Sequence, residues 1–273
     1  MTVQFSLETI EDFQYYTFTP FKEVPGVIHA FTTRRGGVSK GNFSSLNMAL
    51  HVGDEPESVL DNRVRACRKI GINARDLVAG QQVHKDRVEV IRAEHKGRGA
   101  DKYDLSLPET DALITNETSV PLSSYYADCV PLFLLDPVQR VIGLAHAGWR
   151  GTVLRIGEKT VQKMNRFFGT DPADCLAAIA PSIGPCCYEV DYRVITELKK
   201  GFSYWQDLVR ETSSGKYRLD LWETNYRTLT DAGLKPENII TTKVCTCCHN
   251  DVFFSYRAGK GNTGRMASLI MLT

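Results

Sequence analysis

The sequence lacks any long apolar run, since no window approaches the roughly 18 uninterrupted apolar residues of a membrane span. Its first residues show no basic stretch followed by an apolar one, so we expect no secretory signal peptide and a cytoplasmic setting. An excess of charge is also missing, because the formal net charge of the 273 residues is only +1. This balance argues against nucleic acid or a membrane surface as a partner.

Internal repeats and low-complexity linkers are absent as well, so we expect residues 1–273 to form one domain. Hydrophobic residues make up 42% of the chain, which is enough to bury a substantial core. Strand and helix patterns alternate irregularly, and hairpins are evident. That order favours an α+β fold, a layered sandwich with largely antiparallel or mixed sheets, over a doubly wound one.

Eight cysteines are present, among them the adjacent pairs Cys186–Cys187 and Cys247–Cys248. This pattern differs from the disulfide framework of a small secreted protein. We therefore expect reduced thiols, some of them available to a metal ion.

Two apolar runs, 130–135 and 140–145, flank the turn-forming residues 136–139. This pattern predicts a β-hairpin. If the turn closes symmetrically, Cys129 lies opposite His146, just beyond the open ends of the two strands. The sequences around these residues are small or rich in glycine, which suits backbone that turns beside a ligand. The resulting thiol and imidazole corner is the candidate active site.

Other segments are predicted from periodicity and turn signals. Residues 1–31 should supply opening strands, and 31–54, rich in Gly, Ser, Thr and Asn, should form a long ordered loop. The strands predicted at 110–116 and 120–126 should extend the hairpin into one antiparallel meander. A single helix should follow directly over 152–168, with the positive end of its dipole toward the candidate site.

Residues 54–70 predict an amphipathic helix that Asp54 caps. Pro56 suits its first turn. Its inward stripe is expected to contain Val59, Leu60, Val64, Cys67 and Ile70. Two further helices are predicted at 192–200 and 220–232, the second capped by Asp220.

One thiol and two imidazoles match a catalytic zinc site, in which three protein ligands leave a fourth position for water or substrate. Cys129 and His146 would supply two of these ligands. His84 lies in a short polar break between two β-rich runs, and it joins them only if the fold brings it to the same corner. Zinc would lower the pKa of a bound water toward about 7, and the same ligands also suit copper.

Two further groups of cysteines are less persuasive as metal sites. Residues 245–249, CTCCH, superficially resemble a structural zinc site, but we expect this segment to continue a β-strand. Cys248 would then face away from Cys245, because alternate strand residues point to opposite sides. Cys186 and Cys187 follow a buried strand in a tight turn, where packing is the simpler explanation.

Several blocks of the sequence resemble the signature of the laccase-domain family. They are FTTRRGGVS at 31–39, QQVH at 81–84, ADCVPLFLLDP at 127–137, AHAGWRGT at 145–152, IGPCCYEV at 183–190 and FFSYRAGKGNTGRMASLI at 253–270. That family was once labelled multicopper polyphenol oxidase and is now regarded as purine nucleoside phosphorylases with adenosine deaminase activity. The chain departs from the family at Lys85, where a small residue commonly follows the motif histidine.

The resemblance implies an αββα-type layered domain and a zinc ion bound by His84, Cys129 and His146. It also implies phosphorolysis of adenosine, inosine, guanosine and methylthioadenosine, and deamination of adenosine in the same pocket.

Phosphorolysis needs an anion held against the sugar C1′, which calls for cations near the site. The candidates are Arg34, Arg35, Arg150, Arg257 and Arg265. A solvated surface pair explains Arg34 and Arg35 equally well. Asp128 is expected either to support the site or to cap the backbone. Phe31, Phe43 and Trp149 could stack on a base or pack in the core.

Three other functions compete with phosphorolysis and deamination, and the first of them is disfavoured as the main role. A multicopper oxidase needs a mononuclear and a trinuclear copper centre, and the six histidines are too few for both. A metal-free hydrolase could use Cys129 as nucleophile and His146 as base, as in the peptidoglycan editing proposed for relatives of the family. A metal-storage or redox-sensing protein would need only the thiols.

Overall fold

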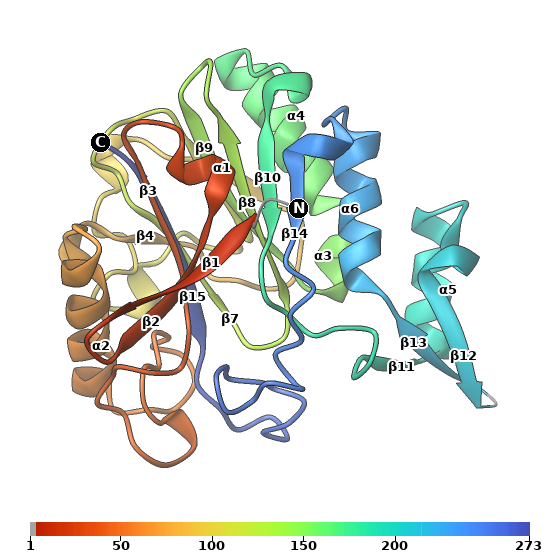
Figure 1. Cartoon of the computed structure of the whole chain (residues 1–273), viewed down its shortest axis with the longest axis horizontal. Helices are drawn as coiled ribbons and strands as arrows, with labels where there is room; N and C mark the ends of the chain where they lie inside the picture. Colours follow the sequence, from red (N-terminus) through yellow and green to blue (C-terminus); the bar gives the residue numbers. More distant parts are fainter. Residues whose placement is uncertain (1–3, 214) are drawn as a thin grey trace.

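The computed structural model describes residues 4–213 and 215–273. Two six-stranded sheets pack face to face, and helices cover the outer face of each, so the layers run helix, sheet, sheet, helix (Figure 1). Most strand pairs are antiparallel, and β4–β7, β5–β6 and β10–β14 are parallel. The predicted α+β layered sandwich is confirmed.

The first sheet has the spatial order β1 (Phe5–Ile10), β2 (Phe13–Phe18), β3 (Val27–Thr32), β15 (Met266–Leu272), β7 (Leu122–Tyr126) and β4 (Val78–Ala79). The second sheet has the order β14 (Ile239–Thr241), β10 (Leu176–Ile179), β8 (Val130–Asp136), β9 (Val141–Ala147), β6 (Ala112–Thr115) and β5 (Val88–Val90). A small third sheet contains β11 (Glu189–Asp191), β13 (Lys216–Leu219) and β12 (Val209–Ser213), and forms the extension on the right of Figure 1.

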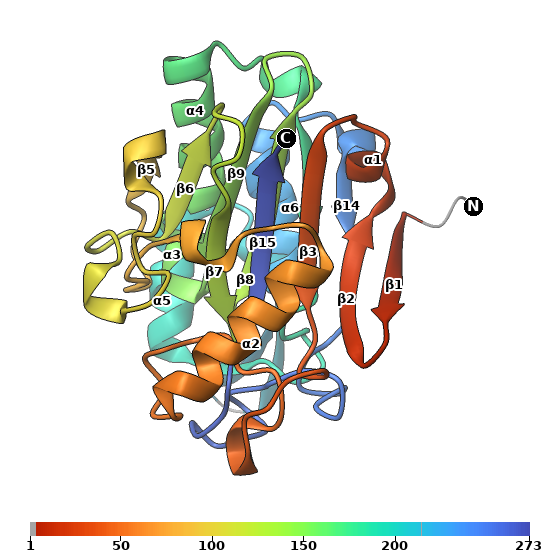
Figure 2. The ribbon, with the colours of Figure 1, turned by 90° about the vertical axis from the view of Figure 1, so that its left-hand side faces the viewer.

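The α-helices are α1 (Thr19–Lys22), α2 (Pro56–Lys69), α3 (Trp149–Val153), α4 (Ile156–Phe168), α5 (Tyr192–Gly201) and α6 (Leu221–Asp231). Figure 2 shows α2 lying across the outer face of the first sheet, whereas α4 and α6 cover the second. Among the described residues, no helix is both long enough and apolar enough to cross a membrane.

Both faces of β8 are buried, which explains its continuous apolar sequence. Leu132 and Leu134 pack toward α4 and α6, whereas Phe133 and Leu135 pack between the two sheets. The second sheet is therefore the central layer of the core.

The chain passes between the two large sheets at the positions that matter for the candidate site. Residues 80–87 connect β4 of the first sheet to β5 of the second, and residues 127–129 connect β7 of the first sheet to β8 of the second. The predicted single meander is therefore wrong, because β7 pairs with β15 and β4. Of the predicted neighbours only β8 and β9 pair, and β6 lies beside β9 instead of β7.

The predicted hairpin is present as β8 and β9, but its register differs. Pro131, and not Cys129, lies opposite His146. The Asp136 carboxylate accepts two backbone N–H bonds from the turn. This makes Asp136 the last residue of β8 and moves the turn to residues 137–140.

The helix predicted over 152–168 is divided. α3 starts at Trp149, and the chain then breaks at Arg155, which has a left-handed φ of 60°, before α4 begins. α4 ends at Gly169 as predicted. Because α3 is only five residues long, the expected long dipole directed at the site is not formed.

The helix predicted over 54–70 is present as α2, with Pro56 in its first turn. Its buried face differs from the predicted stripe, because Val64 is 52% exposed while Asn62 and Arg63 are buried. Asp54 bonds to Ser39 and Asn47 in the preceding loop instead of capping the helix.

Towards the C-terminus, the helices predicted at 192–200 and 220–232 are present as α5 and α6. Asp220 caps α6 as expected, since its carboxylate accepts a bond from the Glu223 N–H. The strand predicted to reach the 245–249 cysteines ends early, at Thr241, and the cysteines lie in a turn.

Candidate active site

His84, Cys129 and His146 converge, and their ligand atoms all lie within 4.8 Å of one another. His84 lies on one connection between the large sheets and Cys129 on the other, while His146 lies near the end of β9. The two connections therefore bring residues 62 and 17 positions away from His146 in the sequence to one edge of the second sheet.

Gly148 leaves the space in which these side chains meet. Continuing the register of β8 and β9 sets Cys129 opposite Gly148. A Cβ atom at Gly148 would lie 2.8 Å from Cδ2 of His84 and 3.1 Å from the sulfur of Cys129. A side chain there would displace two of the three converging groups, so the site depends on this glycine.

Asp111 organises the site, and the motifs of the sequence did not single it out. Its carboxylate lies 2.8 Å from Nδ1 of His146 and also accepts the backbone N–H groups of Val83, His84 and Lys85. One buried carboxylate thus orients the His146 ring and anchors the loop that carries His84. The signal in the sequence was an aspartate directly before a buried strand. That strand is β6, which pairs with β9.

The three side chains also form a strongly coupled electrostatic group. Burial acts to raise the pKa of Cys129, but His146 and His84 outweigh it and lower that pKa to about 6. Burial acts to lower the pKa of His146, but Cys129 and Asp111 outweigh it and raise that pKa to about 9. Without a cation, a thiolate beside an imidazolium is therefore the favoured state.

The donor set fits a divalent metal ion. A thiolate and two imidazoles are borderline-soft ligands that suit zinc and copper. The hydrogen bond from His146 Nδ1 to Asp111 leaves Nε2 of that ring as a metal ligand, an arrangement typical of metal-binding histidines.

A cavity of about 450 Å³ opens beside these three residues, a size within the roughly 300–1,000 Å³ of small-molecule sites. Its lining combines aromatic rings, three arginines and the candidate ligands. The lining residues are His51, Gln82, His84, Tyr125, Ala127, Asp128, Cys129, His146, Trp149, Arg150, Ile183, Tyr188, Leu221, Tyr256, Arg257 and Arg265.

The predicted anion-binding arginines separate into two groups. Arg150, Arg257 and Arg265 line the cavity, whereas Arg34 and Arg35 are not among its lining residues. The Arg34 guanidinium donates to the carbonyl oxygens of Ser44 and Asn250, so it holds the loop together. Arg35 is an exposed side chain beside Asp251 on the surface.

Arg150 and Arg257 differ in the hydrogen bonds that their guanidinium groups make with the protein. Arg257 donates to the carbonyl oxygens of Cys187 and Glu189. The Arg150 guanidinium lies over the Trp149 ring, and within the described ranges it has no hydrogen bond or ion pair. Arg150 is therefore free to bind an anion that enters the cavity.

Asp128 faces the cavity but is fully engaged with the protein. Its carboxylate accepts hydrogen bonds from the hydroxyls of Thr246 and Ser255 and from the backbone N–H of Arg257. It therefore joins the connection that carries Cys129 to the C-terminal glycine-rich loop, which combines both roles expected from the sequence.

The aromatic residues considered for base stacking also separate. Trp149 lines the cavity, together with Tyr188 and Tyr256. Phe31 is fully buried against Tyr126 and belongs to the core between the sheets.

Comparison with known proteins identifies relatives over most of the chain. The model of the family described as multi-copper polyphenol oxidoreductase laccase matches residues 28–273. Purine nucleoside phosphorylase YlmD of Bacillus subtilis is 41% identical over 89% of this chain and 88% of that protein. Adenosine deaminase RL5, from an unknown prokaryotic organism, is 37% identical over 89% of this chain and 92% of that protein.

Solved structures share the fold as well. The crystal structure of YlmD from Geobacillus stearothermophilus superposes with a TM-score of 0.93 at 38% sequence identity, covering 98% of each chain. The structure of Neisseria meningitidis protein NMB0706 gives a TM-score of 0.81 at 29% identity, covering 99% of each chain.

Proposed function

This chain belongs to the multi-copper polyphenol oxidoreductase laccase family, and we propose that it is a zinc-dependent purine nucleoside phosphorylase that also deaminates adenosine. The proposed substrates are adenosine, inosine, guanosine and methylthioadenosine, with inorganic phosphate as the second substrate of phosphorolysis. The names of the two relatives support both activities. The observation that carries the proposal is the convergence of His84, Cys129 and His146 at a cavity lined by arginines and aromatic rings.

We assign the metal to His84, Cys129 and His146. When bound, zinc supplies Lewis-acid activation of water for deamination. Asp111 fixes the orientation of the His146 ring, and Gly148 leaves room for the thiolate and the His84 ring. The metal-binding role of the thiolate requires a reducing compartment, which supports a cytoplasmic enzyme.

Phosphate and the purine are assigned to different walls of the cavity. Arg150 is the favoured phosphate ligand, because its guanidinium lies over the Trp149 ring and makes no hydrogen bond or ion pair with the described residues. The rings of Trp149, Tyr188 and Tyr256 provide apolar faces for the flat base. We further propose that residues 1–273 act as one catalytic unit.

The test is incubation of the purified protein with adenosine, with and without phosphate, followed by identification of the products. Ribose 1-phosphate and adenine indicate phosphorolysis, whereas inosine indicates deamination. Failure to form either set of products, with zinc bound at the site, would reject the proposal.

A second candidate function is a metal-free hydrolase in which Cys129 is the nucleophile. The lowered pKa of Cys129 and the raised pKa of His146 favour it, because a thiolate and imidazolium pair is the resting state of such enzymes. Activity toward an amide or ester that survives complete metal removal would support this alternative. Restoration of nucleoside turnover by zinc alone would support the metal-dependent enzyme, and restoration by copper would change the assigned metal.

A further inference from the structure

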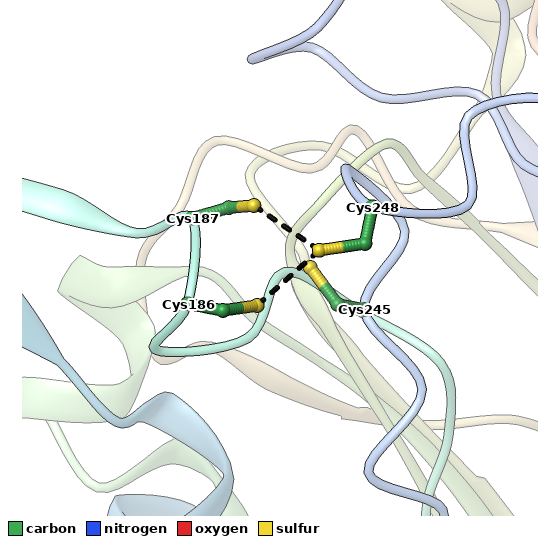
Figure 3. Close-up of side chains that lie close together, drawn as sticks. All are labelled: Cys186, Cys187, Cys245 and Cys248. Carbon is green, nitrogen blue, oxygen red and sulfur yellow. Dashed lines mark hydrogen bonds between the residues drawn. The ribbon is translucent and has the colours of Figure 1, made fainter.

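Four cysteines from two distant segments meet outside the catalytic trio of His84, Cys129 and His146 (Figure 3). The sulfur atoms of Cys186, Cys187, Cys245 and Cys248 all lie within 4.8 Å of one another. Cys186 and Cys187 lie in the turn before β11, and Cys245 and Cys248 lie in the turn after β14. The predicted strand would have turned Cys248 away from Cys245, but the turn brings both sulfurs to the same side.

The separations of the sulfurs match a tetrahedral metal site. Zinc bonds to sulfur at about 2.3 Å, so tetrahedral geometry sets neighbouring sulfurs about 3.8 Å apart. The sulfur of Cys248 lies 3.5 Å from that of Cys186 and 3.4 Å from that of Cys187. These values are far from the roughly 2.05 Å of a disulfide bond, and each cysteine is a free thiol.

Backbone groups of both segments favour a thiolate at Cys245. The N–H of Gly184 donates to the sulfur of Cys245 at 3.3 Å, and the backbone N–H of Cys248 also bonds to it. Cys245 and Cys248 have the C-x-x-C spacing common in structural zinc sites. The backbone around Cys245 thus already suits a metal-bound sulfur.

We propose that Cys186, Cys187, Cys245 and Cys248 bind a second zinc ion in a closed, structural four-cysteine site. The proposal goes beyond the catalytic function and does not depend on it. A divalent cation offsets the repulsion among four crowded thiolates, and all four protein ligands leave no open position for chemistry. The ion therefore joins the turn before β11 to the turn after β14.

The site has a consequence for the catalytic cavity. Arg257, which lines the cavity, donates to the carbonyl oxygens of Cys187 and Glu189, and Tyr188 lies between these two residues. Fixing Cys187 to the turn at Cys245 therefore fixes one wall of the cavity. Arg257 and Tyr188 act here as residues that the zinc ion positions.

Metal analysis of the full chain tests the proposal. The unmodified protein should contain about two zinc ions per chain, and Cys248→Ser about one. Cys247→Ser is the matched control, because Cys247 lies next to Cys248 but outside the cluster; it should retain both ions. Equal zinc content in the unmodified protein and Cys248→Ser would overturn the proposal, as would iron in place of zinc or a disulfide within the cluster.

A second measurement leaves the cluster intact. In Cys129→Ser, which removes a ligand of the catalytic trio, the remaining zinc should show X-ray absorption from sulfur neighbours alone, at about 2.3 Å. Nitrogen or oxygen neighbours around that ion, or its absence from a folded variant, would overturn the four-cysteine site. Nucleoside turnover is not read in either experiment, so the two proposals can fail separately.

Discussion

Asp111 offers a direct test of the proposed metal site formed by the trio His84, Cys129 and His146. Asp111→Asn should weaken zinc binding at the trio by about 10–100-fold, because an amide holds the His146 ring and three backbone N–H groups less firmly. Competition with a chelator measures the change. Glu109→Gln alters an exposed carboxylate two positions away, and zinc affinity should stay as in the parent. Equal affinities for all three proteins would remove Asp111 from the site.

Arg150 should determine the affinity for phosphate. Arg150→Ala should raise the KM for phosphate about tenfold or more, since a hydrogen bond to a charged group contributes about 1.5–3 kcal/mol. Steady-state phosphorolysis at varied phosphate concentrations measures this effect. Arg35→Ala changes an arginine outside the cavity lining and should leave the KM unchanged. A larger rise in KM for Arg35→Ala than for Arg150→Ala would place the phosphate site at Arg35, another of the candidates predicted from the sequence.

His29 should make stability depend on pH. Burial, followed by the charge of Lys22, lowers its pKa to about 3, while Nε2 accepts the backbone N–H of Phe18. Folding therefore favours the neutral ring, and below about pH 6.5 the unfolded chain binds the extra proton. Stability present above pH 6.5 is lost as the pH falls toward 3.

His29→Gln keeps an acceptor for the Phe18 N–H and removes this titration. Between pH 7.5 and pH 5, the unmodified protein should lose about 2 kcal/mol more stability than the variant, which denaturant titration measures. Parallel curves for the two proteins would show that His29 is not responsible.

At the residue scale, types and spacing indicated Cys129 and His146, because a short hairpin relates them. His84 depended on a resemblance between sequences, since its own neighbourhood marks only a loop. Asp111 could not be recognised, because its partners lie on a connection and a strand that only the folded chain brings together.

Among the elements, α2 shows where periodicity fails. The predicted stripe included Val64, yet the helix buries Asn62, whose amide bonds to Ser39 and to the carbonyl oxygens of Ser45 and Asn47. A hydrophobic pattern cannot reveal a buried face that binds a loop through polar groups. The start of α2 at Pro56 and the cap of α6 at Asp220, by contrast, follow from local signals, although the predicted cap at Asp54 does not form.

This polar face gives a prediction for the helix. Asn62→Ala should destabilise the protein by about 3 kcal/mol, because it removes hydrogen bonds to the buried carbonyl oxygen of Asn47, the Ser39 hydroxyl and the partly buried N–H of Val38. Val64→Ala on the exposed face should change stability by less than about 0.5 kcal/mol. Thermal or denaturant unfolding gives both values, and a larger loss for Val64→Ala would contradict the observed burial.

For the whole molecule, composition and local pattern indicated the fold class but not the partners of each strand. The strand at β7 has the same local character as its neighbours, and its place in the first sheet depends on β15, about 140 residues later in the chain. Only the packing of all the layers decides such a pairing. The convergence of the two connections, which adds His84 and Asp111 to the site, was therefore beyond local inference.

Phe133 tests the packing between the two large sheets. Phe133→Ala should cost about 3–5 kcal/mol, because it empties a fully buried position against Phe18. Val138→Ala, at a residue of the hairpin turn that is 63% exposed, should have little effect. Calorimetry measures both changes. A small loss at Phe133 would mean that the interface between the sheets contributes less than its burial indicates.

Two of the three proposed metal ligands, His84 and Cys129, lie on the chain segments that cross from one large sheet to the other. An ion bound by both connections links them to each other, and its release requires those segments to move apart. Release of the metal therefore depends on a local separation of the two connections, so the bound ion should exchange slowly with free ions in solution. The proposed metal site is therefore also a point at which the two large sheets are held together.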